Sequence, residues 1–477
     1  MSRRISNQDY DMNNLKSNKL WIIYGIVFAA FVCMGVFAGL HHEPWADEAQ
    51  SWLIARDSHT LIDLLQAVKY EGTLPTWHLI NKVFQLAGLD YSHMFVIPLT
   101  FSAIGVILLF FTDAPLTAKI MLPFSFFAVY QNAVVARQYA LVFPAMMLIV
   151  ILYKKRFEMP VRYHMTLFLL ALTSSYGVVV TCSFMLWDFI CMVGKRFKDP
   201  IHKKSIIPFF ATGIVIVVMS ILSLPPADCS MTFGKESFAK NAVIALLFNL
   251  DDEVFNWIFL ILFSVLLIYY FRHRLLQVSV IFLPFVIYMN VLYQRPWHMT
   301  YLFFLLVSLM IIFRDDFKKT SRHIEDVGNL LTNSIITLLL AVQCFTGCYS
   351  IYYDYQYAYC PAKEVAEFIR PYVESDTTID RLVFYAIAVS PYYDHSIYSN
   401  DPYGKSYYVW SKNAPNFVTT EDQPEVVVTY RHLEAYDNPD YDFYRFDSHM
   451  IFKLDEVEQI PYVVYVRKDI QRSSHND

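Results

Sequence analysis

The sequence predicts a polytopic α-helical membrane protein that carries a small α/β domain outside the membrane. Of its 477 residues, 56% are hydrophobic and only 17% are charged, and the mean hydropathy is +0.35. Soluble domains carry ~25% charged residues, so this composition is typical of a chain that keeps most of its helices in lipid. A net charge of −5 provides no basic surface for nucleic acid, and no nucleic-acid partner is expected.

Repeated apolar runs predict the transmembrane region, residues 20–350. Residues 1–19 are polar and are expected to form a cytoplasmic tail. A transmembrane helix needs ~20 consecutive apolar residues, and by this criterion the chain has about eleven spans. We expect them at 20–40, 91–112, 119–135, 139–153, 162–175, 177–194, 206–224, 254–271, 275–293, 298–313 and 331–350.

Basic residues between these runs predict the orientation of the chain. The clusters all fall on the side of the N-terminus, which the positive-inside rule makes cytoplasmic. They are Lys154-Lys155-Arg156, Lys195-Arg196-Phe197-Lys198, Lys203-Lys204, Arg272-His273-Arg274 and the segment 314–322. The first loop, 41–90, and the C-terminal portion are therefore expected outside the cytoplasm.

Two short segments of the first loop predict amphipathic helices. Apolar residues recur at helical spacing in 60–70 and again in 76–88, where Trp77 and Val83 face away from His78 and Asn81. Because both segments are short and one-sided, we expect helices that lie on the membrane surface.

The composition changes near residue 351, where the chain becomes richer in tyrosine and in charge. Residues 361–372 predict an amphipathic helix, and 381–389, 425–430 and 461–467 predict strands. A small soluble α/β domain over 351–477 is therefore expected outside the membrane.

The acidic stretch 41–57 is the candidate active site. It follows the first span directly and places four carboxylates beside two tryptophans: Glu43, Asp47, Glu48 and Asp57 with Trp45 and Trp52. Partial desolvation gives a carboxylate the raised pKa that a general base needs. The alternative is that Asp47 and Glu48 only begin a helix, where the dipole favours acids. The residue pattern does not rank one of the two above the other.

Three arginines are predicted near the same outer face: Arg56, Arg137 and Arg295. They run against the charge bias that orients the chain, and interfacial charge of this kind indicates function. Arginine holds phosphate through two parallel hydrogen bonds, so we expect the three to bind a lipid phosphate. Trp297 and His298 would add an aromatic wall and a further phosphate contact. The alternative for any one arginine is snorkelling to lipid headgroups.

Metal and nucleotide sites have little support. His41, His42, Glu43 and His78 fit no standard zinc spacing. The acidic run Asp251-Asp252-Glu253 precedes a span and is better explained as a helix cap than as a divalent-cation site. Since the sequence also contains no Walker motif and no glycine-rich dinucleotide loop, no cofactor is expected.

Four motifs follow one another along residues 20–313. They are Glu-Pro-Trp-Ala-Asp-Glu-Ala-Gln-Ser-Trp-Leu-Ile-Ala-Arg-Asp at 43–57, Tyr70-Glu71-Gly72 with Pro75-Thr76-Trp77-His78-Leu79, Val-Ala-Arg137-Gln-Tyr139-Ala-Leu, and Arg295-Pro-Trp297-His298. In this order they resemble bacterial GT-C glycosyltransferases, which are related to dolichyl-phosphate-mannose–protein mannosyltransferases and the aminoarabinose lipid A transferase. The chain departs from relatives that read Glu-Gly-His-Pro-Pro-x-Trp, because Thr73 and Leu74 replace the His and the first Pro.

This resemblance implies a polyprenyl-phosphate sugar donor, transfer outside the bacterial cytoplasmic membrane, and Asp47 as the catalytic base. Glu48 would shape the site or pair with an arginine. Arg137, Arg295 and His298, together with Arg56, would neutralise the donor phosphate as it leaves. The expected substrate pocket comprises Trp45, Trp52, Asp57, Glu71, Trp77, His78, Tyr139 and Trp297.

We therefore predict an inverting membrane glycosyltransferase. Its expected partners are a polyprenyl-phosphate sugar, membrane lipids, and an acceptor that is a glycan, a lipid or a protein. A lipid-linked glycan polymerase or ligase is an alternative, which would share the arginines but use a whole oligosaccharide donor. A transporter or flippase would need charged groups deep in its spans and on both faces, whereas this chain gathers them at the outer face.

Overall fold

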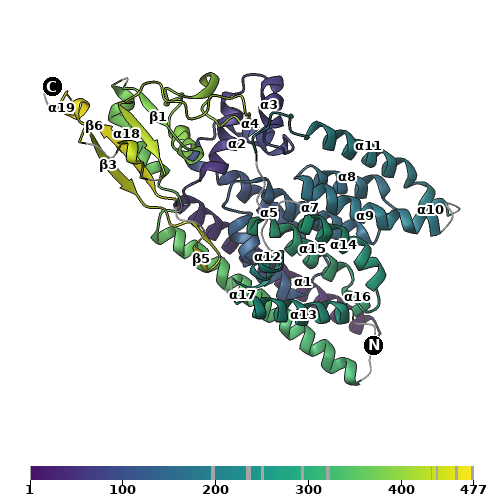
Figure 1. Ribbon diagram of the computed structural model, residues 1–477. Coiled ribbons are helices and arrows are strands. Elements are labelled where there is room, and N and C mark those ends of the chain that lie inside the picture. The colour runs from purple at the N-terminus through teal and green to yellow at the C-terminus, as the bar shows by residue number, and fades with distance from the viewer. Residues whose placement is uncertain are drawn as a thin grey trace.

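The computed structural model is mostly helical and carries a small sheet domain near the C-terminus, which confirms the predicted class in outline (Figure 1). The sheet domain lies at one end of the helical bundle, and the N-terminus lies at the other (Figure 1). The structure describes residues 2–194, 199–231, 238–248, 252–291, 295–317, 323–375, 377–430, 432–436, 439–456 and 460–473. The predicted basic residues at 195–198 and 318–322, and Asp251, lie outside the described residues.

Within these ranges, six helical stretches are long and apolar enough to cross a membrane. They are Asn18–His41 in α1 (Ser2–His41), Tyr91–Phe110 with α5 (Val96–Phe110), α9 (Ser175–Gly194), Pro200–Leu222 with α10 (Pro200–Lys203) and α11 (Ile206–Leu222), α13 (Glu253–Tyr270), and Val327–Gln356 in α17 (His323–Gln356). The shorter helices of the bundle are α7 (Val142–Tyr153), α8 (Pro160–Ala171), α14 (Leu275–Val291) and α15 (Met299–Ile312). Large apolar side chains such as Ile214 and Ile261 are exposed on α11 and α13, as expected for helices that face lipid.

The predicted continuous span at 119–135 is wrong. The chain forms α6 (Leu116–Met121), a 3-10 turn (Leu122–Phe124) and a π-helical turn, η3 (Phe126–Gln131). Pro123 and the extended backbone of Ser125 interrupt the helical hydrogen bonds. All six side chains of η3 are buried, and irregular backbone at membrane depth is tolerated where protein covers it.

The two amphipathic helices of the first loop are confirmed as α3 (Leu61–Lys69) and α4 (Thr76–Leu86). The predicted faces of α4 are only half right. Trp77 is buried as expected, but His78 and Asn81 are buried beside it, while Val83 is 64% exposed. The helix turns these polar residues toward the protein and leaves apolar side chains outside, which suits a helix at a lipid surface.

The C-terminal domain has a four-stranded sheet in the order β1 (Ile379–Arg381), β2 (Val426–Thr429), β6 (Tyr462–Arg467), β3 (Tyr441–Phe446). The first pair is parallel and the other two are antiparallel. Helix α18 (Ala362–Glu374) packs on the sheet through Val365 and Ile369, and α19 (Lys468–Ser473) follows β6. The predicted helix and the predicted strands at 425–430 and 461–467 are confirmed.

The predicted strand at 381–389 is wrong, because the strand ends at Arg381 and a 3-10 helix, η6 (Phe384–Tyr392), follows. Residues 386–391 of η6 are all buried, so no solvent-facing side exists to produce a strand's alternation. This segment packs against α2 (Ala46–Asp57) of the first loop.

The structure also differs from the predicted end of the last span at 350 and from the predicted separation of the first loop, 41–90, from the C-terminal domain. Helix α17 continues to Gln356, so the change in composition falls inside a helix. Ala49 and Leu53 of α2 belong to the same hydrophobic core as Val426 and Val464 of the sheet. The first loop and the C-terminal domain are therefore one packed unit, because the apolar side of α2 is completed only by the sheet domain.

A hairpin anchors the C-terminal domain to the helical bundle. Strands β4 (Ile451–Phe452) and β5 (Asp455–Glu456) place Lys453 between them, fully buried. Its amino group donates to the carbonyls of Ile244, Ala245 and Leu247 at the end of α12 (Phe238–Leu246). A lysine at a helix C-terminus satisfies carbonyls that have no partner within the helix.

Candidate functional site

The active-site candidate begins where α2 begins. The carboxylate of Glu48 accepts a hydrogen bond from the backbone N of Trp45 at 3.1 Å and thereby starts the helix. Asp47 lies one residue earlier in the same first turn, where the helix dipole favours a carboxylate. Adjacent helical residues point in different directions, so the two acids separate into different environments.

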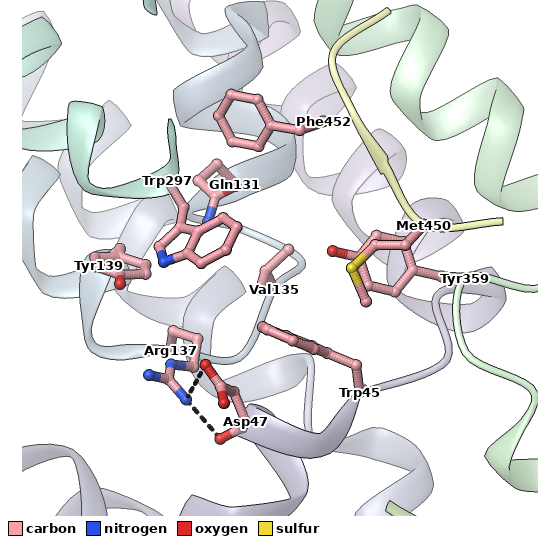
Figure 2. A pocket seen from close by; sticks show the side chains of 10 residues that line it. All are labelled: Trp45, Asp47, Gln131, Val135, Arg137, Tyr139, Trp297, Tyr359, Met450 and Phe452. Carbon is pink, nitrogen blue, oxygen red and sulfur yellow. Dashed lines mark hydrogen bonds and ion pairs between the residues drawn. The ribbon is translucent and has the colours of Figure 1, made fainter. Parts of the chain in front are cut away.

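A pocket lies beside Asp47, with about 370 Å³ of empty space when the open solvent at its mouth is included (Figure 2). Its walls come from five parts of the chain: the start of α2, the segment from η3 to the start of α7, the turn before α15, the segment that follows α17, and the hairpin. The lining residues are Trp45, Asp47, Gln131, Val135, Arg137, Tyr139, Trp297, Tyr359, Met450 and Phe452. The indoles of Trp45 and Trp297 meet edge to face, with their centroids 6.1 Å apart.

Asp47 and Arg137 form an ion pair at this pocket. The Arg137 Nη1 donates to the Asp47 backbone O at 2.7 Å and lies 3.3 Å from the carboxylate Oδ2 (Figure 2). Both side chains keep part of their surface open, 21% for Arg137 and 29% for Asp47. Among the described residues, no hydrogen bond is made by the Nε or Nη2 of Arg137, so these donors remain for a ligand.

Glu48 does not line the pocket, and its carboxylate points into the protein. Its side chain is fully buried, and Oε1 accepts from the backbone N of Ala136 at 2.5 Å. The carbonyl of Ala136 in turn accepts from the Trp77 Nε1 at 3.1 Å. Both polar backbone groups of Ala136 are thus held by buried side chains, which fixes the residue that precedes Arg137.

A buried network continues from Glu48 toward α17. The Nε2 of His42 lies 3.2 Å from the Glu48 carboxylate, and Nδ1 lies 2.8 Å from Asp354, which also accepts from the Tyr130 hydroxyl at 2.7 Å. Burial by itself lowers the pKa of His42, but the carboxylates of Glu48 and Asp354 outweigh it and raise the pKa to about 10. A protonated His42 therefore joins two carboxylates beneath the site.

Glu71 lies behind the pair rather than in the pocket. The Gln50 Nε2 donates to its carboxylate at 2.7 Å. Burial raises the pKa of Glu71 to about 7, against the lowering effects of the Gln50 hydrogen bond and the charge of Arg137. His78 is also buried nearby, and burial together with the charge of Arg137 lowers its pKa to about 3. Glu71, Trp77 and His78 thus surround the site without lining it.

Arg56, Asp57 and Trp52 are not brought to the pocket. The Arg56 guanidinium donates to Asp57 Oδ1, the Tyr393 carbonyl and the Ser406 hydroxyl at 2.7, 2.7 and 2.6 Å. Trp52 is buried against Tyr91. The structure therefore places Arg56 against the C-terminal domain and away from the pocket, with each of its three nitrogens bonded to protein.

Arg295 and His298 lie at the edge of the site. His298 is buried with its ring centroid 5.9 Å from that of Tyr139, and its Nδ1 accepts from the backbone N of Arg295 at 3.1 Å. Neither residue lines the pocket, although Trp297 between them does. The segment 295–298 therefore contributes the Trp297 indole to the pocket.

Five lining residues were missed by sequence reasoning: Gln131, Val135, Tyr359, Met450 and Phe452. Gln131 and Val135 lie in the segment for which the sequence predicts a continuous span. Met450 and Phe452 belong to the hairpin of the C-terminal domain, which the sequence predicts to be separate from the membrane region. Only Tyr359 carries a signal, since it lies in the tyrosine-rich stretch that begins near 351.

The arrangement offers a carboxylate as a proton acceptor, a guanidinium with donors available for an anion, and aromatic walls. Across the described ranges, no group of three or more His, Cys, Asp or Glu side chains is placed to hold a metal ion. Comparisons with protein-family models and with curated proteins found no match for this chain.

Proposed function

We propose that the chain is a membrane glycosyltransferase that moves a sugar from a polyprenyl-phosphate donor to an acceptor hydroxyl, with Asp47 as the general base. The observation that carries the proposal is the Asp47–Arg137 pair in an aromatic-walled pocket. A positioned base and a cation for the leaving group are the two needs of this displacement, and one pocket supplies both.

In the proposed step, the acceptor oxygen attacks the anomeric carbon of the donor sugar. The bond between that carbon and the phosphate oxygen breaks, and the configuration at the carbon inverts. The hydroxyl proton passes to Asp47, and the polyprenyl phosphate leaves with the bonding electron pair. Arg137, together with Arg295, stabilises the charge that develops on the phosphate.

The Asp47–Arg137 ion pair links binding of the donor phosphate to activation of the base. Arg137 already contacts Asp47 through Nη1, so a phosphate bound to Nε and Nη2 would compete for the same guanidinium charge. As the phosphate draws Arg137 away, the Asp47 carboxylate loses its ion-pair partner and is released to accept a proton. Donor binding would thus activate the base only when there is a sugar to transfer.

The position of the pocket favours a lipid-linked donor. Helices α7 and α15 both begin beside the pocket and end beside Lys154 and Arg314, which contact Asp113 together. Helix α15 has 14 residues, so it measures about 21 Å, whereas the hydrocarbon core of a bilayer is about 30 Å thick. With the basic residues at the cytoplasmic interface, the pocket lies within the thickness of the membrane, where a donor held in the bilayer can enter it from the side.

We further propose about eleven passes through a bacterial cytoplasmic membrane, with the N-terminus inside and the C-terminal domain outside. This count includes the broken segment 116–131 and the short helices α7, α8, α14 and α15. Single cysteines at Lys155 and Tyr403, in a background without the native cysteines, test the orientation. An impermeant maleimide should label Y403C and not K155C in intact cells, and the reverse pattern would invert the topology.

The direct test uses a radiolabelled polyprenyl-phosphate sugar and the purified chain in vesicles. Asp47→Asn should lower transfer by ~10²–10⁴-fold, the usual loss for a general base. Asp394→Asn removes an exposed carboxylate of the C-terminal domain and serves as the matched control. Normal transfer by Asp47→Asn would exclude the assigned base. Products longer than one added sugar would favour a polymerase or ligase, and movement of lipid without transfer would favour a flippase.

A further inference from the structure

A buried cluster of ionisable groups beside the pocket takes no part in the proposed reaction. His42 is its centre and has a carboxylate at each ring nitrogen: Nε2 lies 3.2 Å from Glu48, and Nδ1 lies 2.8 Å from Asp354. All three side chains are at most 1% exposed. A neutral imidazole has one N–H and would turn a lone pair toward one carboxylate, whereas an imidazolium donates to both. The cluster therefore combines one cation with two anions.

The contact with Glu48 connects His42 to Arg137. The Glu48 Oε2 lies beside His42 and accepts from the backbone N of Trp45. Its Oε1 accepts from the backbone N of Ala136 at 2.5 Å, and Arg137 is the next residue of the chain. A buried carboxylate that loses one of its donors is left with unsatisfied charge, which favours a shift of the side chain. The position of the Arg137 guanidinium therefore depends on the donor that His42 supplies.

The contact with Asp354, and the ring itself, connect His42 to two further walls of the pocket. The Asp354 carboxylate accepts from the Tyr130 hydroxyl at 2.7 Å. Tyr130 belongs to η3, and the next residue, Gln131, lines the pocket. The rings of His42 and Tyr359 pack with their centroids 4.6 Å apart, and the Tyr359 hydroxyl points into the pocket (Figure 2). One buried ring thus supports three of the segments that form the site.

We propose that His42 is a positioning residue, whose charged ring between two carboxylates holds Arg137 in place for the donor phosphate. The inference rests on the proposed function and extends it to a residue that does not line the pocket. A misplacement of about 1 Å in a group that acts on the reacting atoms can cost ~10²-fold in rate. Burial lowers the pKa of His42, but the two carboxylates outweigh burial and raise it to about 10, so the ring is charged at neutral pH.

Stability alone does not account for this cluster. Each charge that leaves water loses its hydration, and the replacement of a buried charged triad by apolar residues of similar volume is often neutral or stabilising. Apolar side chains at 42 and 354 would therefore join α1 to α17 equally well. They could not donate to the Glu48 carboxylate, and that contact is the one that leads to Arg137.

Charge-matched variants test the role in the transfer assay. His42→Gln leaves two buried carboxylates without a cation and should lower kcat about tenfold, with a smaller change in donor KM. Adding Asp354→Asn restores the native net charge, and the introduced glutamine can then donate to Glu48 and accept from the introduced asparagine. The double variant should therefore recover most of the lost kcat. His93→Gln, which removes an exposed pair with Asp90, is the matched control and should keep the native kcat.

A native kcat in His42→Gln, or a double variant no more active than His42→Gln, would overturn the proposal. A purely structural cluster gives the opposite order, because a second substitution within it would lower the folded fraction further and restore nothing. The rates are therefore compared per folded protein.

The charge of His42 can be measured without any variant or substrate. Residues 41–42 form the only His-His pair of the sequence, so in a chain with ¹³C- and ¹⁵N-labelled histidine the peptide signal between them identifies His42. Solid-state NMR of the full chain in vesicles at pH 8 should show both ring nitrogens of His42 protonated, whereas a histidine in water is mostly neutral at that pH. A neutral ring would overturn the proposal.

The two measurements separate this inference from the proposed function. If the unaltered chain transfers sugar and His42→Gln transfers it equally well, the positioning role fails and the proposed function stands. If the unaltered chain consumes no donor, the proposed function and the positioning role fail together, while the charged bridge measured by NMR remains.

Discussion

At the start of α2, Asp47 pairs with Arg137, and at its end Asp57 pairs with Arg56. The first pair joins α2 to the segment before α7, whereas Arg56 and Asp57 both belong to α2. Both pairs are partly buried. At the C-terminal end, the three guanidinium nitrogens of Arg56 donate to Asp57, Tyr393 and Ser406. At the N-terminal end, only one nitrogen of Arg137 makes a hydrogen bond within the described residues.

The two arginines differ in how many of their guanidinium nitrogens already donate hydrogen bonds to protein. All three nitrogens of Arg56 donate to protein, Nε to Asp57 and the other two to the C-terminal domain, which leaves Arg56 few donors for a ligand. Arg137 borders a pocket and keeps donors for an anion. An Asp–Arg pair therefore lies at each end of α2. At the C-terminal end the arginine contacts the C-terminal domain, and at the N-terminal end, in the proposed function, the pair takes part in the reaction.

The largest expected effect is the loss of transfer in Arg137→Gln. Removing a group that stabilises transition-state charge typically costs ~10²–10³-fold in kcat. The same assay on Arg56→Gln should show near-normal kcat at low temperature, because that arginine contacts no substrate. Equal losses of kcat in Arg137→Gln and Arg56→Gln would show that the two ion pairs do not differ in function.

Arg56→Gln should instead weaken the attachment of the C-terminal domain. Hydrogen bonds from a charged donor contribute about 1.5–3 kcal/mol each, and partial compensation by glutamine leaves an expected loss of about 2 kcal/mol. Hydrogen exchange of η6 and the 405–408 segment should rise while exchange within the bundle helices stays the same. Arg137→Gln serves as the comparison, since its loss should leave this exchange unaltered.

Glu48→Gln should reduce transfer about tenfold by loosening Ala136, and so Arg137, without touching substrate. A small displacement of a positioned group has a measurable cost in rate. The loss should appear mainly in kcat, with a smaller change in donor KM. A merely structural role would instead lower thermal stability with normal kcat in the protein that remains folded.

The smallest expected effect is a change in the pH dependence of stability in Glu71→Gln. Burial raises the pKa of Glu71 from 4.5 to about 7, so the folded chain favours its neutral form. Its contribution to stability is complete below pH 4.5 and is lost as the pH rises through about 7. Thermal unfolding of the two proteins between these values should show a steeper decline for the unaltered chain, and parallel curves would contradict the burial of Glu71.

The sequence predicted where the pocket lies in the chain but only part of its lining. Trp45, Asp47, Arg137, Tyr139 and Trp297 were expected together and all line one pocket. The identity of the remaining walls depended on Met450 and Phe452, which lie in a hairpin too short to have a strand pattern. The contacts of Arg56 with the C-terminal domain could not be predicted from the sequence, because their acceptors lie more than 300 positions away.

The sequence alone was enough to predict the class of protein, the helices of the first loop and half of the side chains that line the pocket. Composition and periodicity are local properties, and burial of apolar helices in lipid follows from them directly. Only the tertiary structure separated Asp47 from Glu48. Glu48 turns into the protein to hold Ala136 and His42, while Asp47 faces an open pocket with Arg137. Two adjacent acids have the same chemistry in the chain, and the partners that distinguish them are supplied by distant segments.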